Sequence, residues 1–273
     1  MSFTPQRKLK RKLKKFVIVL FGLYVMIGSA LYFFQEKILF LPTVLEQDYQ
    51  YHFNYNFDEL FLKTDDNATI NALHFKVKNP KGVMLYLHGN AGDLSRWGNI
   101  AEYFVAMDYD VLVIDYRTYG KSTGKLSEQA LYDDAQYCYD YLLKHYSENQ
   151  ITVYGRSLGT GMASQLASKN QPNQLILETP YYSILDVAEH RFPMFPVKSL
   201  LKYHFPTYQY LPETSCPITI IHGTDDSVVP YSSGEKLSKL NLKNLNFVTV
   251  NGADHNNLID FERYHETIKT LLF

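Results

Sequence analysis

The sequence predicts an α/β protein with a mostly parallel central sheet, helices on both faces, a small cap insertion and an N-terminal transmembrane helix. Three observations predict it: apolar runs alternate with helical segments after residue 35, residues 181–214 interrupt this alternation, and residues 16–34 carry no charge. Strand–helix alternation indicates a parallel sheet, because parallel neighbours need crossover connections. Catalytic groups on such sheets lie at the carboxyl ends of strands.

The composition indicates a globular protein. The chain has 273 residues, of which 46% are hydrophobic, so it has enough apolar material for a core and is not intrinsically disordered. Two cysteines, Cys138 and Cys216, are too few for a disulfide scaffold or a structural zinc cluster. Outside the cytoplasm these two cysteines could pair, but the sequence does not give their distance, so it predicts neither a disulfide nor free thiols.

The formal net charge of −1 hides an asymmetry along the chain. Residues 1–15 hold seven basic side chains and no acid, whereas the other residues hold 20 basic and 28 acidic ones. The run FVIVLFGLYVMIGSALYFF follows at 16–34 without a charge. Because about 17–25 apolar residues in a helix span a bilayer, the sequence predicts a transmembrane signal anchor at 16–34.

The cations predict the orientation of this anchor. By the positive-inside rule, residues 1–15 form a basic cytoplasmic tail and residues 35–273 lie outside the cytoplasm, in the periplasm if the source is a Gram-negative bacterium. A signal peptide cleaved after Ala30 is an alternative, because Gly28-Ser29-Ala30 has the small-residue pattern of a cleavage site. A basic arm that binds nucleic acid would leave the apolar run unexplained, and a core helix is excluded because the run has no polar face.

The elements of the body follow from the period of its apolar residues. Two strands joined by a polar turn at 64–67 form an antiparallel hairpin at a sheet edge. Short apolar runs are typical of strands buried on both faces, and longer segments have helical spacing, one of them capped by Ser127. We expect strands at 51–63, 69–77, 83–87, 111–114, 151–154, 175–177, 218–221 and 247–250, and helices at 93–107, 127–146, 158–169, 233–240 and 257–272. The proline-rich segment 181–214 is predicted to be an insertion of short helices.

The strongest chemical signal is Gly155-Arg156-Ser157-Leu158-Gly159 between a predicted strand and a predicted helix. The pattern G-x-S-x-G in this context is a nucleophile elbow: the glycines Gly155 and Gly159 let strand and helix approach, and the serine oxygen projects above the sheet. The alternative is a glycine turn with an incidental serine. Ser157 is therefore the predicted nucleophile.

Two later strand ends carry the partners that a serine nucleophile needs. Asp225 and Asp226 follow the strand at 218–221, and by chemistry alone either carboxylate can orient a histidine. His255 follows the strand at 247–250. The order Ser, Asp, His is the one that the α/β-hydrolase fold requires.

A glycine-rich turn, His88-Gly89-Asn90-Ala91-Gly92, follows the strand at 83–87. Such a turn supplies a backbone N–H to an oxyanion, here from Asn90 or Ala91, while Leu158 supplies the second N–H. The phosphate-binding patterns G-x-x-x-x-G-K-[ST] and G-x-G-x-x-G are absent from the sequence. We expect His88 to hold this loop and not to act as the base.

Taken together, the chain resembles the α/β-hydrolase superfamily, and more narrowly the membrane-anchored bacterial hydrolases of the Bem46 and ABHD13/ABHD17 group. The resemblance implies a serine hydrolase domain over 35–273 with no metal and no cofactor. The pattern H-G-x-x-D-x-x-V-P at 222–230 selects Asp226 as the acid of a Ser157–Asp226–His255 triad. Two positions depart from the family: Thr118 replaces the usual glycine of DYRGYG, and Asp254 replaces that of GAGH, where a second carboxylate would raise the basicity of His255. The segments that carry the resemblance are 34–42, LHGNAGD (87–93), DYRTYGKSTG (115–124), YGRSLGTG (154–161), LETPYYS (177–183), RFPMFPVKSLLKYHFP (191–206), HGTDDSVVP (222–230) and GADHNNL (252–258).

The predicted reaction is cleavage of an acyl ester or thioester through an acyl-enzyme, because an aromatic-rich cap and a membrane anchor favour lipid-like or acylated substrates. One alternative is a serine peptidase of the prolyl-oligopeptidase or aminopeptidase type, for which Asp186 and Glu189 of the cap would bind the amino terminus. Another is a non-catalytic, membrane-tethered binding module, which would have no need of the three triad residues.

Overall fold

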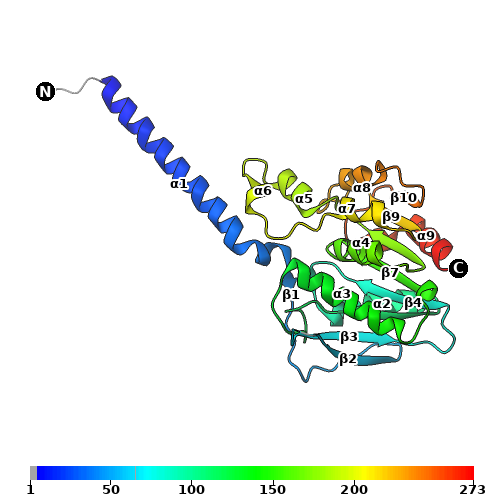
Figure 1. Ribbon diagram of the computed structural model, residues 1–273. Helices are drawn as coiled ribbons and strands as arrows, with labels where there is room; N and C mark the ends of the chain where they lie inside the picture. The colour runs from blue at the N-terminus through cyan, green and yellow to red at the C-terminus, as the bar shows by residue number, and fades with distance from the viewer. Residues whose placement is uncertain (1–4, 65) are drawn as a thin grey trace.

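The computed structural model describes residues 5–64 and 66–273, which form a long N-terminal helix and a folded body (Figure 1). Helix α1, Pro5–Leu39, projects away from the body and is long and apolar enough over Arg7–Leu39 to cross a membrane. The helix is longer than the predicted anchor, because the basic segment before residue 16 and the residues up to Leu39 continue it without a break. Residues 1–4 of the predicted tail lie outside the described residues.

The described part of the body is built on one eight-stranded sheet in the order β10-β9-β8-β7-β4-β6-β3-β2. The strands from β10 to β6 are parallel, whereas β3 and β2 run antiparallel to their neighbours. This arrangement confirms the predicted fold class and the hairpin at the sheet edge. The strands are β2 (Phe57–Lys63), β3 (Thr69–Phe75), β4 (Gly82–Leu87), β6 (Tyr109–Ile114), β7 (Ile151–Arg156), β8 (Gln174–Glu178), β9 (Ile218–Gly223) and β10 (Leu245–Val250).

Helices cover both faces of the sheet and bury an apolar core on each. Within β7, Val153 belongs to the core beneath α3, α4 and α8, and Tyr154 to the core beneath α2 and α9, because successive side chains of a strand point to opposite faces. Ser127 caps α3 as predicted: its side chain accepts a hydrogen bond from Ala130 N. The helices are α2 (Leu94–Val105), α3 (Glu128–Leu143), α4 (Gly159–Lys169), α8 (Tyr231–Ser238) and α9 (Glu262–Leu272).

Two predicted elements begin five or more residues later in the structure. The first strand begins at Phe57 and not at residue 51, because the segment before it is bound to α2: the Glu102 carboxylate accepts hydrogen bonds from the backbone N–H groups of Asn54 and Tyr55. The last helix begins at Glu262 and not at residue 257, after a separate 3₁₀ turn, Leu258–Asp260. Asp65 of the predicted hairpin turn lies outside the described residues.

The segment 181–214 contains short helices: α5 (Ile184–Arg191), α6 (Val197–Leu200), α7 (Thr207–Tyr210) and a 3₁₀ turn at Leu211–Glu213. It lies against the end of α1 that is nearer the body (Figure 1). Its link to the sheet domain includes Glu128 at the start of α3, whose carboxylate accepts hydrogen bonds from the backbone N–H groups of His204 and Phe205. We refer to this segment as the cap.

A small parallel sheet that the sequence did not indicate joins α1 to the body. Strand β1, Leu41–Pro42, follows α1 directly and pairs with β5, Ala91–Gly92, in the turn after β4. Each strand has two residues, too short for a period-2 pattern of apolar residues to appear in the sequence.

The two cysteines are free thiols, and both are buried. Cys138 lies on α3, whereas Cys216 precedes β9. Burial raises the pKa of Cys216 to about 11 and raises that of Cys138 as well. Both side chains therefore act as small apolar groups.

Thr118 adopts a backbone conformation that favours glycine, with φ of 73°. Its Oγ1 is buried and has no hydrogen-bond partner among the described residues. A β-branched residue in this conformation costs about 1–3 kcal/mol.

We predict that Thr118→Gly raises the free energy of unfolding by about 1 kcal/mol and the melting temperature by about 2–4 °C. Thermal unfolding of the detergent-solubilised protein measures this, and a lower melting temperature would contradict the account.

A buried ion pair links β7 to β8 at the edge where Ser157 lies. Arg156 Nε lies 3.2 Å from Glu178 Oε1, and both side chains are less than a tenth exposed. Glu178 also accepts a hydrogen bond from the Tyr154 hydroxyl. Arg156 Nη2 donates to the backbone oxygen of His255 over 3.4 Å, so the pair also contacts the loop that carries the candidate base.

We predict that Arg156→Met lowers the free energy of unfolding by about 3–5 kcal/mol, because it leaves the Glu178 carboxylate buried without its cation. Arg156→Met combined with Glu178→Gln recovers part of this loss, since the charge is then gone. Arg263→Met is the matched control: its ion pair with Glu266 is exposed, and its loss costs less than about 1 kcal/mol. Chemical denaturation measures all three, and equal losses for Arg156→Met and Arg263→Met would refute the assignment.

Candidate active site

The turn between β7 and α4 holds Ser157 in a strained conformation, with φ of 49°. The turn is tight because α4 begins close to β4: a Cβ on Gly159 would lie 2.0 Å from the backbone oxygen of Leu87 on β4. A Cβ on Gly155 would lie 2.7 Å from Ala163 Cβ on α4. Strand and helix therefore need glycine at both predicted elbow positions.

The loops after β9 and β10 bring the other two predicted residues to Ser157. His255 Nε2 lies 2.9 Å from Ser157 Oγ, and His255 Nδ1 lies 2.8 Å from Asp226 Oδ2. All three residues are buried, each at most 9% exposed. Asp225, the other carboxylate that chemistry allowed, is exposed and accepts a hydrogen bond from the Thr224 hydroxyl.

Asp226 remains a carboxylate although it is buried. Burial raises its pKa, but hydrogen bonds from His222 and His255 and from the backbone N–H of Val229 outweigh this effect and lower the pKa below the usual range. His222 is fully buried at the end of β9, with Nε2 3.2 Å from Asp226 Oδ2 and 3.1 Å from Val229 O. No role for His222 was predicted from the sequence, although this residue opens the motif that contains Asp226. In the structure it is a neighbour of the acid.

Asp254, which replaces the glycine usual in the family, joins the two loops of the site. Its Oδ1 accepts hydrogen bonds from Ser227 N and Ser227 Oγ at 2.8 and 2.9 Å. These bonds and one from the backbone N–H of His255 lower the pKa of Asp254. The carboxylate therefore faces the loop of Asp226, and its effect on the basicity of His255 stays a prediction.

Hydrogen bonds to its carbonyl oxygens hold the turn at 88–92 in place. His88 Nδ1 bonds to Gly89 O over 2.6 Å, while Asn90 O accepts bonds from the Tyr119 hydroxyl at 2.7 Å and from Leu41 N at 2.8 Å. His88 is fully buried and stacked on Trp97. In a trans peptide the N–H points opposite to the preceding C=O, so the N–H groups of Asn90 and Ala91 point away from these partners. His88 contacts the loop, as expected, and not the Ser157 hydroxyl.

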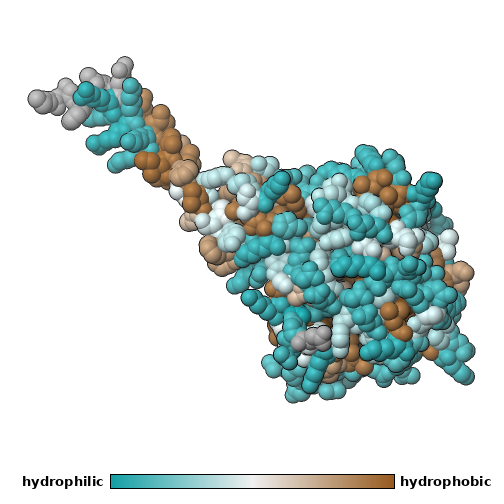
Figure 2. Space-filling model, in the orientation of Figure 1, coloured by the Kyte–Doolittle hydropathy of each residue, from teal (hydrophilic) through white to brown (hydrophobic). Residues whose placement is uncertain are grey.

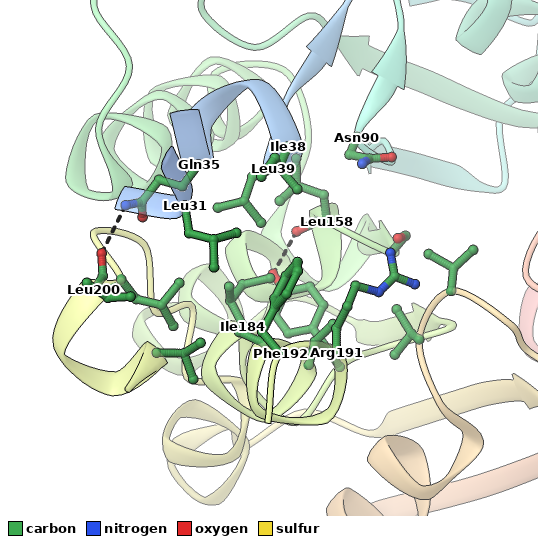
Figure 3. Close-up of a pocket in the computed structure, with 18 residues that line it drawn as sticks. Leu31, Gln35, Ile38, Leu39, Asn90, Leu158, Ile184, Arg191, Phe192 and Leu200 are labelled. Carbon is green, nitrogen blue, oxygen red and sulfur yellow. Dashed lines mark hydrogen bonds between the residues drawn. The ribbon is translucent and has the colours of Figure 1, made fainter. Parts of the chain in front are cut away.

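Two cavities meet at Ser157. One, of about 160 Å³, lies between α1, the cap and the sheet edge, and 13 of its 18 lining residues are apolar (Figure 3). Arg191 carries the only charge among these described residues. The other cavity, of about 150 Å³, has a mixed lining that includes the polar side chains of Arg96, Arg156 and His255. The arrangement can place an apolar group on one side of the Ser157 hydroxyl and a polar group on the other.

Comparisons with known proteins agree with this architecture. The family described as serine aminopeptidase, S33, matches residues 78–214. An uncharacterized protein of Acanthamoeba polyphaga mimivirus is 33% identical over 226 residues, which are 74% of this chain and 76% of that protein. The lysophosphatidylserine lipase ABHD12 of Macaca fascicularis is 29% identical over 283 residues, with 83% of this chain and 69% of the lipase covered.

Among solved structures, the esterase Pf2001 of Pyrococcus furiosus superposes with a TM-score of 0.67 at 18% identity, covering 86% of this chain and 97% of the esterase. An α/β hydrolase of Vibrio vulnificus gives a TM-score of 0.65 at 22% identity, covering 78% and 80%. At these identities the structures support the fold alone. Fold, family match and relatives together show that the chain belongs to the α/β-hydrolase superfamily.

Proposed function

We propose that this protein is a membrane-anchored serine hydrolase that cleaves acyl esters or thioesters of lipid-like or acylated substrates. One observation carries the proposal: His255 bridges Ser157 and Asp226 at 2.9 and 2.8 Å beside an apolar cavity. A histidine between a serine hydroxyl and an ionised carboxylate is the arrangement that activates serine for acyl transfer.

In the proposed reaction, Ser157 Oγ attacks the carbonyl carbon while its proton passes to His255 Nε2. Asp226 holds the imidazole through Nδ1 and stabilises the imidazolium that forms. The backbone N–H groups of Asn90 or Ala91 and of Leu158 bind the oxyanion, and each such donor contributes a factor of about 10²–10³. The imidazolium returns the proton to the departing alkoxide or thiolate, and water then releases the acyl group by the same steps.

The lining of the cavities favours an ester over a peptide with a free amino terminus. An amino group needs a carboxylate partner, yet none of the described residues that line either cavity carries one. Asp186, a candidate for this task, is ion-paired with Lys236 on α8, and Glu189 does not line the cavities. The name of the lysophosphatidylserine lipase relative also favours an ester, whereas the description of the matching family, serine aminopeptidase, is the argument for the peptidase alternative.

The proposal also includes the predicted position in the cell and the predicted domain bounds. Residues 16–34 cross the membrane, residues 1–15 stay in the cytoplasm, and the hydrolase domain at 35–273, with its cap at 181–214, lies on the far side. The length and hydropathy of α1 support the anchor, and the cations before residue 16 support the orientation.

Ser157→Ala is predicted to abolish hydrolysis of p-nitrophenyl butyrate and labelling by a fluorophosphonate, because both need the Ser157 oxygen. The melting temperature of the detergent-solubilised variant, close to that of the wild type, controls for folding. Undiminished turnover by folded Ser157→Ala would show that another group is the nucleophile.

Asp226→Asn is predicted to lower kcat by about 10⁴-fold, because the amide no longer holds the imidazole in the required tautomer. Asp225→Asn is the matched control: the adjacent carboxylate is exposed and does not contact His255, so its kcat stays within about twofold. A similar loss in both variants, measured by steady-state kinetics, would overturn the choice between the two acids.

A further inference from the structure

The apolar cavity beside Ser157 has the membrane helix as one of its walls. Four residues of α1 line it, and they share one face of the helix by their spacing: Leu31, Gln35, Ile38 and Leu39. The opposite wall is α5 of the cap. Figure 3 shows Leu31 pointing from α1 toward Ile184 and the α5 helix that carries it. The cavity is therefore closed on this side by α1.

Hydrogen bonds fix this part of α1 on the cap. The Gln35 side chain is 5% exposed; its Nε2 donates to Leu200 O at 3.0 Å and its Oε1 accepts from Lys202 N at 2.7 Å. The Gln35 side chain of α1 therefore binds the cap backbone at two points, Leu200 and Lys202. The Tyr203 hydroxyl donates to the Glu36 carboxylate at 3.0 Å beside it.

The chain then passes from α1 directly to the loop expected to bind the oxyanion. Leu41 N donates to Asn90 O at 2.8 Å, and Thr43 N donates to Gly92 O at 3.0 Å. Phe40, between the helix and β1, is 3% exposed and contacts the Tyr203 ring of the cap. The anchor is thus joined both to the cavity wall and to the turn beside Ser157.

The tip of the cap lies beside the apolar run of the anchor. Phe195 stacks on Tyr24 with ring centroids 4.8 Å apart and lies over Gly28, and Met194 is 79% exposed. Tyr24 is ten residues before the end of the uncharged run at Phe34, or about 15 Å along the helix at 1.5 Å per residue. If the run spans the bilayer, the apolar tip 192–196 lies among the acyl chains with it. Figure 2 shows hydrophobic surface along α1 and a further hydrophobic patch on the adjoining part of the body.

We propose that α1 is a specificity-determining wall of the active site, and that the occupant of the cavity is a long acyl chain of an ester that resides in the same membrane. The part of the chain nearest the ester fills the space from Ser157 to Leu31 and Ile184, the rest extends past them toward the bilayer beside the cap tip, and the ester carbonyl faces Ser157. This inference rests on the proposed hydrolase function. The apolar cavity, its position at the end of a bilayer-spanning run and the exposed apolar cap tip support this occupant over a soluble peptide.

The test compares the full-length wild type with Leu31→Trp in detergent micelles, using p-nitrophenyl palmitate and p-nitrophenyl butyrate. Tryptophan at residue 31 fills the space between α1 and α5, so we expect the palmitate-to-butyrate ratio of kcat/KM to fall about tenfold or more. Leu20→Trp is the matched control: the same change on α1, at an exposed residue that does not line the cavity, leaves the ratio as in the wild type.

Fluorophosphonate labelling of Ser157 verifies that each variant is folded, and Leu31→Phe replaces Leu31→Trp if the latter is not labelled. An unchanged ratio in a labelled residue-31 variant overturns the assignment of α1 to the acyl-binding wall. An equal fall in Leu20→Trp overturns it as well, because the effect then comes from the membrane and not from the cavity. Failure of the proposed function looks different: the wild type then neither turns over butyrate nor becomes labelled.

Discussion

The contact between α4 and β4 at Gly159 is the constraint on which the geometry of the site depends. The helix begins so close to the Leu87 carbonyl that no side chain fits, and the backbone reaches this position only by a turn that places Ser157 at positive φ. The same close approach of α4 to β4 brings Ser157 next to Gly89, in the turn that follows β4. A Cβ on Gly89 would lie 3.7 Å from Ser157 Cβ. Nucleophile and oxyanion loop are therefore adjacent because of backbone packing, before any hydrogen bond is considered.

Around this contact, buried polar groups fix the loops that carry the remaining residues. His222 and His255 donate hydrogen bonds to Asp226. Asp254 joins the loop of His255 to the loop of Asp226, and Arg156 donates a hydrogen bond to the backbone oxygen of His255. The buried groups among them are costly to bury, and each has a polar partner at the sheet edge, although His222 Nδ1 has none among the described residues. The N-terminal segment adds a second set of links, since β1 pairs with the loop expected to bind the oxyanion and α1 lines the apolar cavity. The apolar helix α1 is therefore connected directly to the site.

Much of this could be predicted from the sequence, because it depends on local pattern. Strands buried on both faces appear as short apolar runs, Ser127 is a cap by residue type, and G-x-S-x-G has meaning once it lies between strand and helix. The juxtaposition of Ser157, Asp226 and His255 followed from the rule that strand carboxyl ends share one edge. What could not be predicted depends on contacts between distant segments. His222 is a buried neighbour of the acid only once β9 is placed, the two residues of β1 leave no periodic signal, and Gln35 is an ordinary polar residue until the cap lies beside it.

If Ser157 is the nucleophile, turnover of a lipid-like ester passes through an acyl group bound to this residue. Rapid acid quench of the wild-type enzyme during turnover of p-nitrophenyl palmitate, followed by peptide mass spectrometry, detects such an intermediate. We expect a palmitoyl group on the peptide that contains Ser157, formed before steady state and lost when substrate is exhausted. Turnover with no acyl group on Ser157, or with a transient acyl group on another residue, would contradict the assignment of Ser157 as the nucleophile.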